Sequence, residues 1–221
     1  MQIVEAIRAG EVATLRRLLA EDPARAESRV DGQRTLLHVA TDWPGHFPNV
    51  RETIAALVAH GADVNAKAIG MPHEERPLHW AASSDDLDAL DSLLDHHADI
   101  EASGGVIGGG TPLSDAVAFA NWRAANRLIG RGARATIWQA AALGLMERLK
   151  EYVPAEPELT NAFWNACHGG QLMAAQYLLS LGANLNWVGH DHLTPLDAAV
   201  RNGNRGLAAW LRSQGAISPK E

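Results

Sequence analysis

Two short clusters of histidine and aspartate come nearest to a metal site in this sequence. They are His-His-Ala-Asp at residues 96–99 and His-Asp-His at residues 190–192. Imidazole and carboxylate groups both bind zinc, but a zinc site needs three or four ligands with supporting hydrogen bonds. Neither cluster has an identifiable further ligand. We therefore interpret both as solvated polar residues at a turn or helix end, and we predict no metal and no cofactor.

Cys167 and His168 form a second candidate, a nucleophilic thiol beside a base. Adjacent helical residues point about 100° apart, so this pair cannot activate itself, and we expect Cys167 to be a buried structural thiol. Asp42, Asp115 and His168 could meet on one face, but spacing does not establish the hydrogen-bond reach that acid–base catalysis needs. No Gly-x-Ser-x-Gly, Walker-type loop or His-Glu-x-x-His occurs. We assign no catalytic residue, and the sequence leans away from an enzyme without deciding the question.

A glycine-rich stretch at residues 103–110 precedes a candidate helix start at Thr111, a position where backbone N–H groups can bind phosphate. A nucleotide-binding loop would also need Gly-Lys-Ser/Thr and a preceding buried strand, and neither is present. We expect a mobile hairpin that carries Val106 and Ile107.

These residues belong to a sequence that repeats itself. Thr-Leu-Leu-His-Val-Ala at residues 35–40 recurs as Arg-Pro-Leu-His-Trp-Ala at 76–81, Thr-Pro-Leu-Ser-Asp-Ala at 111–116 and Thr-Pro-Leu-Asp-Ala-Ala at 194–199. In the last two copies a Gly-Ala pair begins 21 positions after the hexad start, and the same spacing separates Asn161 from Gly-Ala at residues 182–183. A period of this length indicates a stack of similar units.

Each hexad predicts the start of a helix. Threonine caps a helix, proline suits its first turn, and the following leucine and alanine fall on one apolar stripe. A second helix with paired leucines follows. A glycine just beyond this helix adopts the left-handed conformation and ends it. These glycines are Gly61, Gly132, Gly182 and Gly215, whereas His97 takes that position in one unit, and that helix end should be strained or differently closed.

The hexad and the Gly-Ala-Asp/Asn ending together resemble the ankyrin repeat family, whose unit is a β-turn finger and two antiparallel helices. The resemblance implies an all-α ankyrin-repeat solenoid, a single domain over residues 1–221 with about seven helix-turn-helix units that start near residues 1, 35, 76, 111, 135, 161 and 194. It also implies that His38 and His79 make structural hydrogen bonds to the hexad threonine and the neighbouring finger. We place Trp80, Trp138 and Trp164 in the core, where large aromatic residues at helical spacing usually lie.

The repeat is interrupted in the unit that begins at Thr35, where five extra residues fall around positions 42–48. The insertion is either a tolerated surface loop or a binding lip, because Trp43 and Phe47 are costly to expose. Asn49 followed by Glu52 predicts a capping box that restarts the helix. The unit near residue 135 is short and ends in a proline-containing stretch at 152–158, which predicts a missing or stunted finger.

Composition favours a folded cytoplasmic protein. The 221 residues are 47% hydrophobic, contain one cysteine and carry a net charge of −7. One cysteine excludes an internal disulfide framework, and no apolar run or signal peptide predicts membrane insertion or secretion. The net charge disfavours nucleic acids and anionic membranes.

The resemblance implies a non-catalytic protein–protein interaction module that binds its partner through a concave finger and inner-helix face, as a scaffold, inhibitor or neutraliser. The alternative is a small-molecule receptor or unusual enzyme, which a closed apolar pocket near Trp43, Phe119, Trp122 and His168 would favour. The finger positions, the positions just beyond each hexad and the insertion define the predicted partner-binding residues. They are Asp42, Trp43, His46, Phe47, His73, Glu75, Ser83, Ser84, Val106, Ile107, Phe119, Trp122, His168, Trp187, His190, His192 and Arg201.

Overall fold

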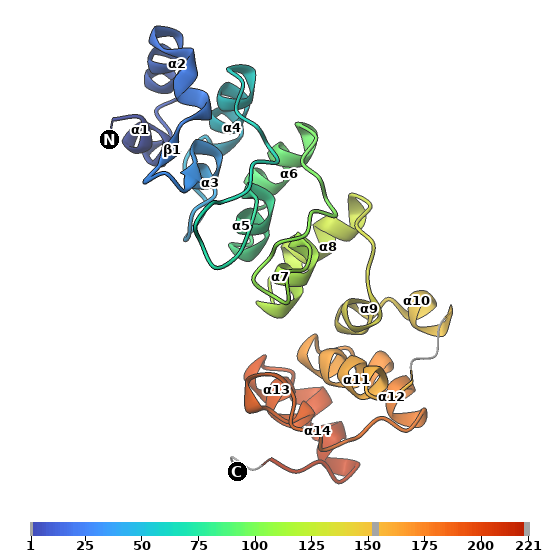
Figure 1. Cartoon of the computed structure of the whole chain (residues 1–221). Helices are drawn as coiled ribbons and strands as arrows, with labels where there is room; N and C mark the ends of the chain where they lie inside the picture. The colour runs from blue at the N-terminus through green and yellow to red at the C-terminus, as the bar shows by residue number, and fades with distance from the viewer. Residues whose placement is uncertain (1, 152–154, 219–221) are drawn as a thin grey trace. The chain divides into compact units, whose positions relative to one another are not determined.

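The computed structural model describes residues 2–151 and 155–218 (Figure 1). Within these residues the chain forms 14 α-helices, two short 3-10 helices and one two-stranded sheet. The helices follow one another as seven pairs, which confirms the predicted all-α repeat architecture. Residue 1, at which the first predicted unit begins, and residues 152–154 of the predicted stunted finger lie outside the described part.

The chain divides into two compact units, Met1–Ala133 and Arg134–Glu221. In the first unit the leading helices α1, α3, α5 and α7 pack in succession, and the second helices α2, α4, α6 and α8 form a layer behind them (Figure 1). The bounds are α1 Gln2–Ala9, α2 Val12–Glu21, α3 Leu36–Ala40, α4 Val50–Ala59, α5 Pro77–Ser83, α6 Leu87–Asp95, α7 Pro112–Ala118 and α8 Trp122–Gly130. The prediction of one continuous domain over the whole chain stays a prediction.

The sheet of the first unit is a finger between the first and second helix pairs. After the 3-10 helix η1 (Pro23–Glu27), strand β1 (Arg29–Val30) pairs antiparallel with β2 (Arg34–Thr35). Thr35 then caps α3 by accepting a hydrogen bond from the His38 backbone N–H. The finger therefore leads directly into the helix that the hexad predicts.

The second unit contains three helix pairs around an apolar core that includes Phe163, Leu178 and Leu211. Its leading helices α9, α11 and α13 pack in succession. The bounds are α9 Ile137–Leu143, α10 Met146–Glu151, α11 Glu158–His168, α12 Leu172–Ser180, 3-10 helix η2 His190–His192, α13 Pro195–Arg201 and α14 Arg205–Ser213. Thr194 caps α13 through the Asp197 N–H, as its hexad predicts.

The ends of the second helices follow the predicted rule. Gly61, Gly132, Gly182 and Gly215 all adopt positive φ, between 90° and 102°. His97 takes the same left-handed conformation with φ of 67° although it carries a side chain. That backbone is less favourable for a residue with a Cβ atom. The helix end at His97 is therefore strained, as one of the two predicted alternatives has it, but it closes with the same backbone bonds as the helix end at Gly61.

One predicted helix start and one predicted helix cap were wrong. Asn161 lies within α11, which begins at Glu158 about one turn earlier, and Pro157 precedes the helix without a side-chain capping bond. Asn49 precedes α4 but makes no capping bond with its side chain. Its amide nitrogen instead donates to the Gly10 carbonyl oxygen at 2.9 Å, so the predicted capping box with Glu52 is replaced by a contact to the first helix pair.

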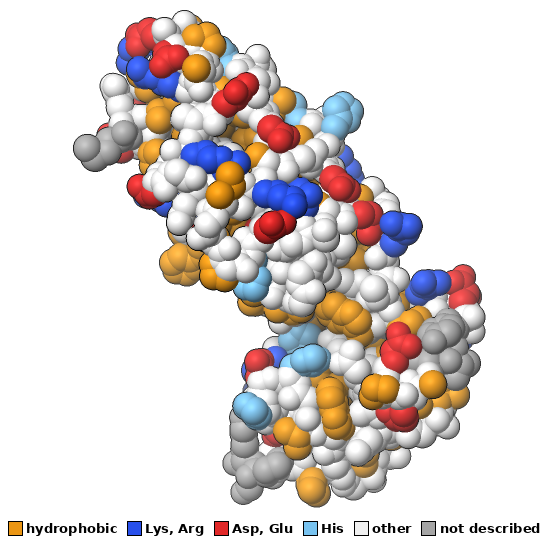
Figure 2. Space-filling model, viewed as in Figure 1, with side chains coloured by type: hydrophobic (Ala, Val, Ile, Leu, Met, Phe, Trp, Pro, Cys, Tyr) orange, Lys and Arg blue, Asp and Glu red, His pale blue; other side chains and the backbone are white. Residues whose placement is uncertain are grey.

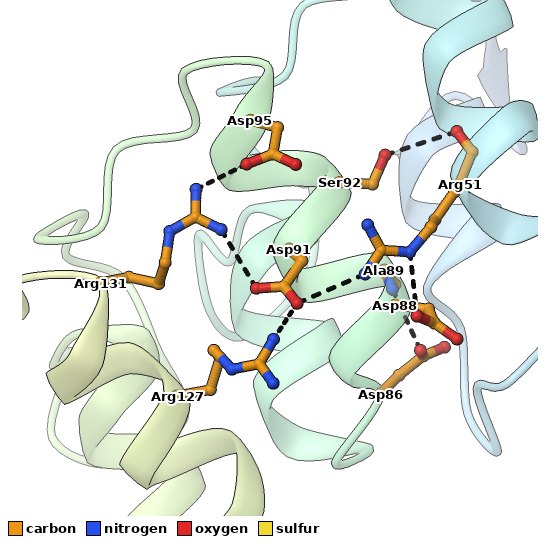
Figure 3. Close-up of polar contacts among 9 residues, drawn as sticks. All are labelled: Arg51, Asp86, Asp88, Ala89, Asp91, Ser92, Asp95, Arg127 and Arg131. Atoms are coloured by element: carbon orange, nitrogen blue, oxygen red, sulfur yellow. Dashed lines mark hydrogen bonds and ion pairs between the residues drawn. The ribbon is translucent and has the colours of Figure 1, made fainter.

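One carboxylate joins three of the second helices in the first unit. Asp91 on α6 accepts hydrogen bonds from Arg51 on α4 and from Arg127 on α8, and Arg131 just beyond α8 donates to its other oxygen (Figure 3). The Asp91 side chain is almost fully buried, whereas the arginines are partly exposed. These charge-assisted bonds tie the second helices of neighbouring repeats together.

Candidate functional site

An open pocket of about 480 Å³ lies on the first unit. We call it the aromatic groove, because Trp43, Trp80 and Phe119 line it together with polar and charged residues. Its complete lining is Asp31, Gln33, Arg34, Asp42, Trp43, Met71, Glu75, Trp80, Ser83, Ser84, Val106 and Phe119. The groove therefore draws on three successive repeats.

The repeat geometry brings these residues together. Trp43, Ser84 and Phe119 each lie eight positions after their hexad start, and α3, α5 and α7 pack in succession. The β1–β2 hairpin contributes three residues beside them, and the later fingers contribute Glu75 and Val106. Corresponding positions of stacked units thus form one continuous surface.

Aromatic side chains of the groove remain unusually exposed. Trp43 is 81% exposed and Phe119 is 48% exposed. Trp80 is half-buried, and its ring meets His38 edge to face at 5.0 Å. The prediction that Trp80 and Trp138 lie in the core was therefore wrong, because both side chains are half-buried. Trp164 is buried, as predicted. The half-buried Trp80 lines the groove beside Trp43 and Phe119.

Most of the groove's charge is already paired. Arg34 donates to the Asp42 carboxylate at 3.0 Å and lies 3.9 Å from Asp31, and Arg8 also donates to Asp42 at 3.2 Å. Glu75 differs, because it is 8% exposed and makes no ion pair with any residue the structure describes. Burial raises the pKa of its carboxyl group, while the Trp80 indole donates a hydrogen bond to it.

A second carboxyl group lies beneath the glycine-rich loop. Asp115 is fully buried and accepts a hydrogen bond from the Ile107 N–H at 3.1 Å, while its Oδ2 atom has no hydrogen-bond partner in the structure. Burial raises the pKa of Asp115 to about 7, and the negative charge of Glu75 adds to the shift. Backbone bonds from Gly104 N to Gly109 O and from Gly105 N to Gly110 O close the glycine-rich loop, which forms turns without paired strands.

Another cluster forms in the second unit. Trp164 stacks on His168 at 5.4 Å between ring centroids, and His190 meets Trp164 edge to face at 4.9 Å and Trp187 at 6.1 Å. The Asn202 amide nitrogen lies 2.8 Å from His168 Nδ1, and Trp164 donates its indole N–H to the Leu193 carbonyl oxygen. His168 is buried, so this cluster packs a finger onto α11.

The predicted partner-binding residues divide between these places. Asp42, Trp43, Glu75, Ser83, Ser84, Val106 and Phe119 line the groove. His46, Phe47, His73, Ile107 and Trp122 belong to the first unit but not to the lining, and His168, Trp187, His190, His192 and Arg201 belong to the second unit. His46 fixes the inserted loop, since its backbone N–H donates to Asp86 at 2.6 Å. Arg201 pairs with Asp191 at 2.6 Å.

Sequence reasoning missed five lining residues. Asp31, Gln33 and Arg34 belong to the finger before the Thr35 hexad, a finger that the repeat spacing could have identified. Trp80 was assigned to the core, and nothing in the sequence pattern distinguished Met71.

Within the first unit, Asp42 and Asp115 have separate partners. Asp42 is paired with arginines, and Asp115 is bound to the loop backbone. Cys167 is buried, and burial raises the pKa of its thiol. Within residues 2–151 and 155–218, no three His, Cys, Asp or Glu side chains are placed to hold a metal ion. No helix in the same residues has the length and apolar character to cross a membrane.

Family models match three segments of the chain. A model described as "Ankyrin repeats (many copies)" matches residues 163–212, and models described as "Ankyrin repeat" match residues 73–102 and 32–69. The chain is an ankyrin repeat protein. Ankyrin repeats are in general protein-interaction modules.

Similar proteins agree with this assignment. Rabankyrin-5 of Homo sapiens is 29% identical over 213 residues, and the match covers 95% of this chain and 16% of the human protein. Rabankyrin-5 of Mus musculus is 29% identical over 192 residues, and the match covers 86% of this chain and 14% of the mouse protein. This ankyrin chain thus spans about a sixth of the human relative. The human ASB11 ankyrin repeat domain superposes with a TM-score of 0.57 at 22% identity, covering 98% of this chain and 85% of that one, a likeness of fold.

Proposed function

We propose that this ankyrin repeat protein binds a protein partner through the aromatic groove of its first unit and acts as a scaffold, inhibitor or neutraliser. The exposure of Trp43 carries the proposal, because an 81% exposed tryptophan beside a half-exposed Phe119 is an energetically unfavourable surface in isolation. Tryptophan is also among the residues that most often dominate the binding energy of interfaces.

The open form of the groove supports a macromolecular partner. A small-molecule receptor would enclose most of its ligand, whereas Trp43 and Phe119 stand largely in solvent. Trp122 and His168 do not line the groove, so nothing favours the small-molecule alternative. The net charge of −7 and the single cysteine support a protein partner over nucleic acid, and a cytoplasmic location.

The proposal is tested with the double variant Trp43→Ala, Phe119→Ala. Partners that co-purify with the wild-type chain should be lost from the variant, while its thermal unfolding should change little because both side chains are exposed. Met173→Ala with Val200→Ala is the matched control, since it also removes two exposed apolar side chains but from the second unit. Retention of the partners by the groove variant, or equal loss in both, would contradict the proposal.

A further inference from the structure

The Glu75 carboxylate is the one charged group of the groove lining whose charge no described residue balances. Glu75 is only 8% exposed to solvent. The Trp80 indole N–H donates a hydrogen bond to its carboxylate and satisfies part of its hydrogen-bonding capacity. A buried carboxylate without a cation is costly, and the cost falls when an opposite charge arrives. The lining residues Asp31 and Asp42, by contrast, already share Arg34.

The arginines that contact the groove lining pair with Asp31 and Asp42 and not with Glu75. Asp115 lies close enough for the negative charge of Glu75 to add to the rise of its pKa, and Asp115 Oδ2 has no hydrogen-bond partner in the structure. Asp31 and Asp42 are paired with Arg34 and Arg8, so the ionised Glu75 carboxylate gives the groove an excess of negative charge. Such a surface attracts cations.

The walls of the groove suit the shape of a long cationic side chain. Trp43, Trp80 and Phe119 offer aromatic faces, and Met71 and Val106 add apolar surface. The faces of aromatic rings attract guanidinium and ammonium groups, and the methylene stems of arginine and lysine pack on apolar surface. A volume of about 480 Å³ is within the usual range of ligand sites.

We propose that the partner inserts an arginine or lysine side chain into the aromatic groove, with its charge on the Glu75 carboxylate and its stem against Trp80 and Phe119. This inference rests on the proposed function and names the chemistry that the groove recognises. Arg34 stays engaged with Asp42 and Asp31 and does not compete for Glu75.

The test uses hexapeptide libraries that differ only in one fixed central residue: arginine, lysine, citrulline or glutamate. Citrulline has nearly the shape of arginine but no charge, so the comparison isolates the charge. Binding to the full chain is measured by fluorescence polarisation. The arginine and lysine libraries should bind at least about tenfold more tightly than the citrulline library, as a charge-assisted hydrogen bond to a buried carboxylate requires. The glutamate library should bind most weakly.

In the Glu75→Gln variant, the affinity for the arginine library should fall to that for the citrulline library. The amide oxygen can still accept the Trp80 hydrogen bond, so the fold should persist. Glu52→Gln on α4 makes the same change of charge at an exposed position outside the groove lining, and should bind like the wild type. Equal binding of the arginine and citrulline libraries, binding by neither, or an effect of Glu52→Gln as large as that of Glu75→Gln would overturn the inference.

The two proposals can fail separately. If Trp43→Ala with Phe119→Ala abolishes partner capture while Glu75→Gln does not, the groove is the interaction surface but recognises no cation. If the groove variant leaves capture intact, the proposed function itself fails.

Discussion

The Nε2 atom of His38 lies 3.1 Å from the carbonyl oxygen of Glu75, so the hexad histidine of one repeat is hydrogen-bonded to the finger of the next. His79 repeats this relationship, with Nε2 at 3.2 Å from the Gly110 carbonyl oxygen. Each ring accepts a backbone N–H at Nδ1, from Thr35 and from Arg76. Both rings are therefore neutral and donate through Nε2–H, and these bonds confirm the structural role that the family resemblance implied.

These two histidines should make the protein sensitive to acid. Burial lowers the pKa of His38 and of His79 from 6.5 to about 4. Between these values the unfolded chain binds protons that the folded chain does not, so stability falls as the pH falls from 6.5 towards 4. The difference of about 2.5 pKa values corresponds to at most about 3 kcal/mol for each ring.

The check is a titration followed through the imidazole ¹⁵N chemical shifts. Both rings should remain neutral at pH 5.5, and the free energy of urea unfolding should be lower at pH 5 than at pH 7. His38→Gln and His79→Gln assign the two resonances by their absence. Protonation of either ring at pH 6 in the folded protein would contradict the prediction.

Asp115 should act in the opposite direction. Its pKa of about 7 in the fold exceeds the ordinary 3.8, so the folded state holds a proton that the unfolded state releases between these values. Asp115 therefore contributes favourably to the stability of the fold at low pH, and this contribution declines as the pH rises from 3.8 to 7. Asp115→Asn removes the charge while retaining an oxygen for the Ile107 N–H.

We expect Asp115→Asn to be more stable than the wild type by about 2 kcal/mol at pH 8, and nearly equal to it at pH 4. Denaturant unfolding across this range measures the difference. Asp88→Asn, at an exposed position of α6, controls for the change of net charge. A variant that loses stability relative to the wild type between pH 4 and pH 8 would show that Asp115 is ionised in the fold without cost.

The Asp91 network offers a third prediction. Asp91→Asn should lower the free energy of unfolding by about 1–3 kcal/mol, because the guanidinium groups of Arg51, Arg127 and Arg131 lose a nearly buried anion but keep access to water. Asp88→Asn breaks an exposed pair with Arg51 and should cost at most about 1 kcal/mol. Chemical denaturation in low and high salt compares them. Equal effects of the two substitutions would rule out a special contribution from Asp91.

Local signals in the sequence were enough to find the helix pairs. A hexad such as that at Thr194 contains its own capping bond to Asp197, and Gly215 closes the following helix through its own positive φ. Where local and tertiary contacts compete, the sequence was insufficient. Asn49 turns its side chain to Gly10 on the preceding helix pair, and a contact 39 residues away cannot be read from the capping pattern.

The groove was predicted in part for the same reason. Positions just beyond the hexads, such as Trp43 and Phe119, follow from the repeat register alone. The free face of Trp80 depends on which residues the adjacent fingers place over it, and the burial of Asp115 depends on the loop that folds above it. These features depend on the elements that pack beside the groove, and the repeat pattern alone does not predict them.

Gly169 shows how closely successive repeats approach in the second unit. It ends α11 with φ of −78°, an ordinary backbone conformation, yet a Cβ atom added there would lie only 1.8 Å from the carbonyl oxygen of Ala142 on α9. The requirement for glycine therefore comes from the contact between helices. Gly169→Ala must push α9 and α11 apart, and we expect a loss of at least about 3 kcal/mol.

Gly206→Ala is the matched control within the same unit, because it lies inside α14 with no atom within 4 Å of an added Cβ. It should stabilise the unit by about 0.5–1 kcal/mol, since alanine loses less conformational entropy in a helix than glycine does. Hydrogen exchange of the α9 and α11 amides measures both effects, and Gly169→Ala should accelerate exchange there while Gly206→Ala should not. Unchanged protection in Gly169→Ala would mean that α9 and α11 can separate without cost, and the stacking contact would then contribute little to the stability of the second unit.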